Sequence, residues 1–283
     1  TKANGLYKAG EIIPLTLTFS ENVTLTGSSG LTLTLNSGRS LTITADRLNN
    51  TTTATLNYTV APGENAAGLA VSTLELGQGS FLRDRSGNNA ILDAPTANIN
   101  GQKSIVIDTT ITTPSFVLNN DTGALPTDGI SQDGSINVAL AQDVASWRYS
   151  TNTGSSWSAG SGTGFQLPEG TYTPGAIRVE QTDRAGNISP LAENARAITI
   201  DRTAPTVAIE TQGASNQPRP VLRGTTNGAG LTVTISLRRG NTQIDSQVVP
   251  TTAVAGSSNG SWVLDNSSAA PLPDGTYTIT AVA

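Results

Sequence analysis

The feature that most restricts the fold of this chain is a strict alternation of apolar and small polar residues. In residues 13–19, 31–35 and 231–237, every second position is aliphatic or aromatic, with Thr, Ser or Pro between. A period of two places one face of a β-strand against a core and the other face in water. The pattern returns in residues 56–60, 136–140, 198–200 and 276–279. Turn residues separate these segments, so the sequence predicts an all-β chain of antiparallel sandwiches, with barrels as the less favoured alternative.

Two internal repeats set the predicted number of domains. Leu167–Thr173 repeats as Leu272–Thr278 at an offset of 105 residues, and Asp84–Asn88 repeats as Asp183–Asn187 at an offset of 99. Such offsets match the length of one sandwich.

The boundaries between the sandwiches follow from a third repeat. An Ile-x-Ile-Asp segment ends at Asp108 and again at Asp201, and a proline follows each within a few residues. We therefore predict sandwiches over residues 1–108, 109–201 and 202–283. The last is expected to be incomplete at its C-terminus. The linkers are short and lack a Gly/Ser run, so an elongated rod is expected.

Composition excludes several classes of function. The 283 residues include no Cys, His or Met, which removes disulfides, thiolate nucleophiles and imidazole chemistry. Sixteen Lys and Arg against 21 Asp and Glu give a net charge of −5 with no basic stripe, so nucleic acid is not an expected partner. No apolar run is long enough to span a membrane, and membrane insertion is not expected. The acidic residues lie in turn sequences expected to be exposed, so no enzyme activity is predicted.

Carboxylates concentrate at turns and predicted boundaries, where they suggest a structural cation. Oxygen-only ligand sets suit Ca²⁺, which accepts 6–8 oxygens in loose geometry. We expect the loop after Leu167, which carries Glu169, to converge with Asp183 and Asp201 at one pole of the middle sandwich. The competing interpretation is turn capping, because Asp before Gly-Asn also serves a tight turn. The sequence leaves both interpretations open.

The tryptophans offer a second candidate site. Trp147 and Trp262 lie in strand-like segments and are expected in the cores. Trp157 follows a polar loop, where an exposed ring is a possible contact for a sugar or another ligand.

Taken together, the Asp-Arg-Ala-Gly-Asn turn, the Leu-Pro-Glu-Gly-Thr-Tyr segment and the Ile-Thr-Ile-Asp-Arg-Thr-Ala-Pro boundary resemble the tandem bacterial immunoglobulin-like repeats of giant type I-secreted adhesins. The resemblance covers nearly the whole chain. It implies immunoglobulin-like sandwiches that act as extracellular extender modules, with Ca²⁺ at the interdomain boundaries. Carried over residue by residue, the implied ligands are Asp183, Asp201 and Glu169, and by repetition Asp84 and Asp108.

The resemblance also implies the partners. Neighbouring repeats of the same chain would flank each sandwich, and other regions of a cell-surface adhesin would bind the host, surface or biofilm ligand. Two alternatives remain open at this point. One is a carbohydrate- or protein-binding module that uses Trp157, and the other is a filament subunit completed by a strand from the next copy.

Overall fold

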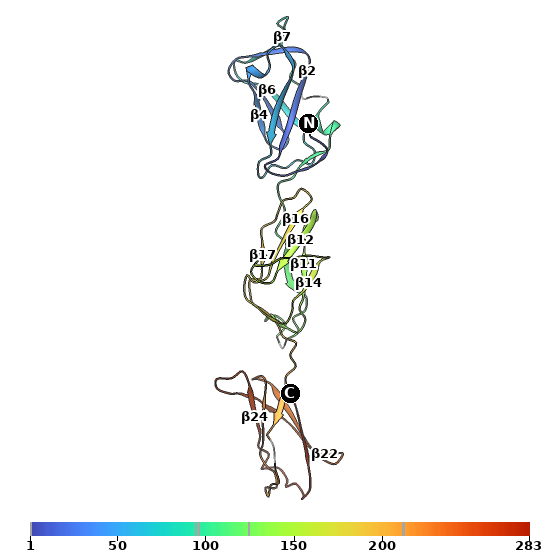
Figure 1. The fold of residues 1–283 in the computed structure, drawn as a ribbon, viewed down its shortest axis with the longest axis vertical. Helices are drawn as coiled ribbons and strands as arrows, with labels where there is room; N and C mark the ends of the chain where they lie inside the picture. Colours follow the sequence, from blue (N-terminus) through green and yellow to red (C-terminus); the bar gives the residue numbers. More distant parts are fainter. Residues whose placement is uncertain (1, 94, 96, 124, 211–212) are drawn as a thin grey trace. The chain divides into compact units, whose positions relative to one another are not determined.

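The computed structural model describes residues 2–93, 95, 97–123, 125–210 and 213–283 (Figure 1). Helix in these residues is confined to a 3₁₀ turn, η1 (Ala45–Arg47), and a single turn, α1 (Ile99–Gln102). All other regular structure in the described residues is β-strand, which confirms the all-β prediction. No helix in this part of the chain is both long and apolar enough to cross a membrane.

The chain divides into two compact units, Thr1–Asp201 and Arg202–Ala283. The predicted boundary after residue 201 coincides with this division. The predicted boundary after residue 108 lies inside unit 1, and the division of unit 1 at that point stays a prediction. Below, the part of unit 1 before residue 109 is called the first sandwich, and residues 109–201 are called the second sandwich.

The first sandwich packs two antiparallel sheets of three strands. One sheet has the order β5-β2-β7 and the other β4-β3-β6, and a parallel pair, β1-β8, lies beside them. The strands are β1 (Gly5–Tyr7), β2 (Ile12–Thr26), β3 (Leu31–Leu35), β4 (Ser40–Ile43), β5 (Thr51–Thr59), β6 (Val71–Leu76), β7 (Phe81–Asp84) and β8 (Ile105–Ile107).

The alternation seen in the sequence places the core of the first sandwich. Leu31, Leu33 and Leu35 of β3 are buried, whereas the threonines between them are only partly buried. On the outer faces, hydroxyls pair across strands, as Thr16 does with Thr55 at 3.1 Å and Thr34 with Ser40 at 3.1 Å. Cross-strand pairs of this kind stabilise a sheet without charge.

Tyr58 of β5 is a buried polar group whose ionisation should affect stability. Its hydroxyl donates to a Glu64 carboxylate oxygen at 2.9 Å and lies 3.1 Å from the Ser37 hydroxyl. Burial, reinforced by Glu64, raises the pKa of Tyr58 to about 12. An unfolded tyrosine ionises near pH ~10.

Between these two values the folded chain binds more protons than the unfolded chain, so its free energy of unfolding should fall as pH rises from about 10 to about 12. Urea unfolding at a series of pH values checks this, with Tyr58→Phe as the variant that should lose this part of the slope. An identical slope in the two proteins would contradict the assignment.

The described residues of the second sandwich form ten strands around the core tryptophan. Its sheets have the orders β14-β11-β9, β13-β12-β16-β17 and β10-β18-β15, of which only the β10-β18 pair is parallel. Trp147 of β12 is 7% exposed and donates from Nε1 to the Gly162 carbonyl at 3.1 Å, as expected for a core residue. The strands are β9 (Ser115–Leu118), β10 (Ile130–Ser131), β11 (Ser135–Ala139), β12 (Val144–Ser150), β13 (Ser158–Ala159), β14 (Gly164–Gln166), β15 (Gly170–Tyr172), β16 (Arg178–Asp183), β17 (Ala192–Glu193) and β18 (Ile198–Ile200).

Unit 2 is also built from two antiparallel sheets, β19-β20-β24-β23 and β22-β21-β25. Trp262 fills its core at 1% exposure, packed with Leu222, Val233 and Ile235. Gly224 has no side chain because a Cβ there would overlap the Trp262 ring and the carbonyl of Ala208. The strands are β19 (Val207–Ile209), β20 (Leu222–Thr226), β21 (Thr232–Arg239), β22 (Thr242–Pro250), β23 (Thr252–Ala253), β24 (Gly260–Leu264) and β25 (Thr278–Val282).

Candidate metal centre

Three carboxylates gather where the first sandwich passes into the second. Asp108 directly follows β8, Asp143 directly precedes β12, and Asp183 is the last residue of β16. One oxygen of each lies within 4.8 Å of the others, and no other such group of three occurs in the described residues. The structure therefore brings together two predicted ligands, Asp108 and Asp183, and adds Asp143, which the sequence did not single out.

Asp183 is held by the turn that the repeated motif predicted. Its Oδ1 accepts the backbone N–H of Asn187 at 2.8 Å, and its Oδ2 accepts the Asn187 side-chain amide at 2.7 Å. Gly186 takes φ +87°, a left-handed conformation that favours glycine. Asp183 is only 2% exposed. The expectation that all the acidic residues are exposed is thus wrong for Asp183, because it lies on the same buried face of β16 as Val179 and Gln181.

Asp108 lies in an electrostatically unfavourable place for a lone carboxylate. Burial raises its pKa, the neighbouring charges of Asp183 and Asp143 raise it further, and the backbone N–H of Thr110 partly offsets these effects. None of the ion pairs between described residues includes these three carboxylates. Like charges held this close favour a cation between them.

The donor set fits calcium. Three carboxylates supply oxygen ligands without nitrogen or sulfur, and Ca²⁺ takes six to eight oxygens from carboxylates, carbonyls and water. Asp108, Asp143 and Asp183 are the residues that would hold it. Asp143 precedes a strand of the second sandwich, Asp183 ends another, and Asp108 lies at the end of the first sandwich, so an ion bound by all three would join the two sandwiches.

Asp84 forms the same turn but lies outside the group. Its two carboxylate oxygens accept the backbone N–H and the side-chain amide of Asn88, each at 2.7 Å. The side-chain hydrogen bond from Asn88 is the main reason why the pKa of Asp84 is lowered. For Asp84 the turn-capping interpretation describes what the structure shows.

Glu169 and Asp201 are also outside the group of three. Glu169 directly precedes β15, and Asp201 directly follows β18. The backbone N–H of Asp201 donates to the carbonyl of Ser131, in the neighbouring strand β10, at 2.9 Å. The chain enters the second sandwich at one end and leaves it at the other (Figure 1). The expected convergence of Glu169, Asp183 and Asp201 is therefore not found, because β16 ends at the entry of the sandwich and β18 ends at its exit.

Trp157 lies beside a surface hollow of about 310 Å³ on the outer face of β12 and β16. The Arg148 guanidinium lies over its ring, 4.6 Å from the centroid, and Arg148 also pairs with Glu180 at 2.6 Å. A ring covered in this way offers less open surface for a sugar than the sequence suggested.

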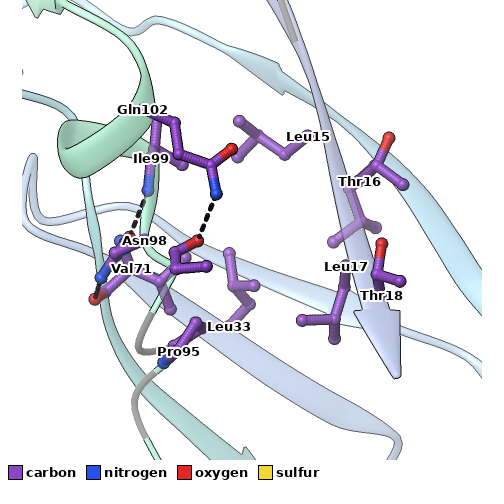
Figure 2. A pocket seen from close by; sticks show the side chains of 12 residues that line it. Leu15, Thr16, Leu17, Thr18, Leu33, Val71, Pro95, Asn98, Ile99 and Gln102 are labelled. Carbon is purple, nitrogen blue, oxygen red and sulfur yellow. Dashed lines mark hydrogen bonds between the residues drawn. The ribbon is translucent and has the colours of Figure 1, made fainter. Parts of the chain in front are cut away.

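A second hollow, of about 390 Å³, lies in the first sandwich between β2 and the segment around α1. Figure 2 shows Leu15, Leu17 and Leu33 on one side of it and Ile99 on the other. Asn98 closes one end by exchanging hydrogen bonds with the backbone of Val71, at 2.9 and 2.8 Å. The residues that line this hollow include no titratable side chain.

The chain is similar to several solved structures, but it matches no known protein family. No family model matches the chain, and no curated protein matches it. Among solved structures it is similar to the fibronectin(III)-like modules of Clostridium thermocellum CbhA, at 13% identity and a TM-score of 0.25, covering 70% of this chain and 90% of that one. It is similar to a Dpr2 Ig1-Ig2 complex with DIP-Theta Ig1-Ig3, at 11% identity and a TM-score of 0.31, covering 99% and 95%. It is also similar to dimeric latent PorU from Porphyromonas gingivalis, at 13% identity and a TM-score of 0.21, covering 99% and 30%.

Proposed function

We propose that this chain is a structural extender of a bacterial cell-surface adhesin, in which Ca²⁺ stiffens the joint between the first and second sandwiches. The observation that carries the proposal is the meeting of Asp108, from the end of the first sandwich, with Asp143 and Asp183 of the second, within 4.8 Å. The resemblance of the repeats to adhesin extender modules supports the extracellular location. The chain would separate a ligand-binding region from the cell and would catalyse no reaction.

The same three carboxylates explain why an ion would matter to the fold. Without a cation, Asp108 contributes most to stability below the unfolded pKa of 3.8, because its folded pKa is raised. That contribution is lost as pH rises through the folded pKa, so at neutral pH the repulsion destabilises the joint. A ligand that binds the folded state alone stabilises it by mass action, by about 2.7 kcal/mol when its free concentration is 100 times Kd.

Asp108→Asn tests the proposal, because it should have opposite effects in chelator and in calcium. In chelator at pH 7 the variant should melt at or above the temperature of the wild type, since one repelling charge is gone. In saturating calcium it should melt lower, since a ligand is gone. Differential scanning calorimetry of unit 1 gives the melting temperatures, and titration calorimetry gives the calcium affinity.

Asp84→Asn is the matched control. Asp84 caps an equivalent turn outside the carboxylate group, so this variant should keep the full calcium response. Equal melting temperatures of the wild type in calcium and in chelator, with no heat of calcium binding, would overturn the calcium proposal.

Carbohydrate binding at Trp157 is the second candidate, favoured by the hollow beside the ring and opposed by the guanidinium stacked on it. A glycan array separates the two candidates. Binding that Trp157→Ala abolishes and that chelator does not affect would favour the carbohydrate module.

A further inference from the structure

We infer that the side-chain amides of Gln181 and Asn187 hold the linker between the two sandwiches of unit 1 in one fixed position. The linker is residues 108–114, between β8 and β9. This amide lock does not need a bound ion. The inference deepens the proposed function, because it concerns the same joint and rests on that joint being a stiff spacer. Both residues are positioning residues, since they donate to backbone carbonyls of the linker.

Gln181 is a fully buried amide, 0% exposed, in the middle of β16. Its Nε2 donates to the carbonyl of Thr112 at 2.7 Å, and its Oε1 accepts the backbone N–H of Ala141 at 2.9 Å. A buried amide whose two ends are both bonded has a fixed orientation, and loss of either partner leaves a buried polar group unsatisfied. Gln181 therefore fixes the far end of the linker to the core of the second sandwich.

Asn187 fixes the near end. Its Nδ2 donates both to the Asp108 carbonyl at 2.9 Å and to Asp183 Oδ2 at 2.7 Å. The bond to the linker uses the backbone oxygen of Asp108 and leaves the carboxylate of that residue available. At Asp108, the lock and the candidate metal site thus use different atoms, the backbone oxygen and the carboxylate.

The first sandwich anchors the linker from its own side. The backbone N–H of Asp108 donates to the Tyr7 carbonyl at 3.0 Å, and that of Thr109 donates to Asn65 Oδ1 at 2.9 Å. Lys8 Nζ reaches across to the carbonyl of Gly186, in the Asp183–Asn187 turn, at 2.8 Å. The linker is thereby hydrogen-bonded on both sides by groups that do not depend on a cation, which restricts the domain motion otherwise expected across a short linker.

The chain contains a matched control for this lock. In the equivalent turn of the first sandwich, Asn88 makes the same two bonds to Asp84. Among the described residues, no bond joins the Asn88 side chain to the second sandwich. Asn187→Ala and Asn88→Ala remove the same turn contacts, and Asn187→Ala alone removes a contact to the linker.

Spin labels on the two sandwiches measure the effect. The chain has no cysteine, so Thr42→Cys on β4 and Thr171→Cys on β15, both exposed, give two clean labelling sites. Double electron–electron resonance on the full chain is compared in calcium and in chelator. We expect the labelled parent to give one narrow distance distribution in both conditions. Adding Asn187→Ala with Gln181→Met should broaden it about twofold in chelator, and Asn88→Ala should leave it narrow.

Each outcome decides the inference. If the labelled parent broadens in chelator as much as the double variant does, the ion alone locks the joint and the inference is wrong. If the double variant stays narrow in chelator, the amides are not the lock. Asn187→Ala alone serves if Gln181→Met fails to give the far-ultraviolet spectrum of the parent. A double variant whose distance distribution is equally broad in calcium and in chelator would reject the calcium proposal and keep the amide lock.

Discussion

Trp262→Ala is expected to unfold unit 2 while unit 1 stays folded. Trp262 is 1% exposed, and among the described residues its cluster contains only three other buried hydrophobics, Leu222, Val233 and Ile235. Truncating a core tryptophan costs about 3–5 kcal/mol, because the transfer free energy is lost and the cavity collapses only partly. A small domain has only about 5–15 kcal/mol of stability in total. The core of unit 2 therefore has few other buried contacts to compensate for this loss of stability.

Calorimetry and amide NMR spectra check this result. The transition assigned to unit 2 should disappear or move far down in temperature, and the resonances of unit 1 should not shift. Trp157→Ala is the control, because Trp157 is only partly buried and should cost much less. A loss below about 1.5 kcal/mol in Trp262→Ala would mean that the core of unit 2 repacks around the missing ring.

Asp183→Ala should have the second largest effect, because Asp183 is both a turn cap and a candidate metal ligand. Hydrogen bonds to a charged group contribute about 1.5–3 kcal/mol each, and Asp183 accepts two from Asn187. Relief of repulsion with Asp108 and Asp143 offsets part of that loss. We expect a cost of about 2 kcal/mol in chelator and of about 4–5 kcal/mol in saturating calcium.

Asp84→Ala separates the two contributions of Asp183. It removes the same kind of turn cap from the first sandwich, outside the carboxylate group. Its cost, measured by chemical unfolding, should be the same in calcium and in chelator. A cost of Asp183→Ala that is also independent of calcium would assign Asp183 to the turn alone.

Much of the fold could be predicted because the signal for a strand is local. The alternation over residues 13–19 lies in β2, and that over residues 231–237 lies largely in β21. The full length of β2, Ile12–Thr26, could not be predicted in the same way. Its pairing with β5 shifts register between Thr18 and Val23, where β7 becomes a second partner. Such a shift depends on strands that lie far away in the sequence.

The candidate site shows the same limit. Asp108 and Asp183 were found because each belongs to a repeated motif. Asp143 belongs to none, and it reaches the site because Val144 pairs with Asp183 across β12 and β16. Knowledge of that strand pairing would have identified Asp143 as a candidate ligand, but no local sequence pattern encodes the pairing. Glu169 and Asp201 were grouped with Asp183 because the sequence does not tell at which end of a sandwich a strand stops.

The hydroxyl pairs on the outer sheet faces bear on where such a chain can work. Thr16 with Thr55, and Thr171 with Thr199, join neighbouring strands through neutral groups at 3.1 Å. Dissolved salt screens ion pairs between exposed side chains and leaves contacts between neutral groups nearly unchanged. The stability that strand pairing of this kind provides should therefore depend little on the salt concentration of the surrounding medium.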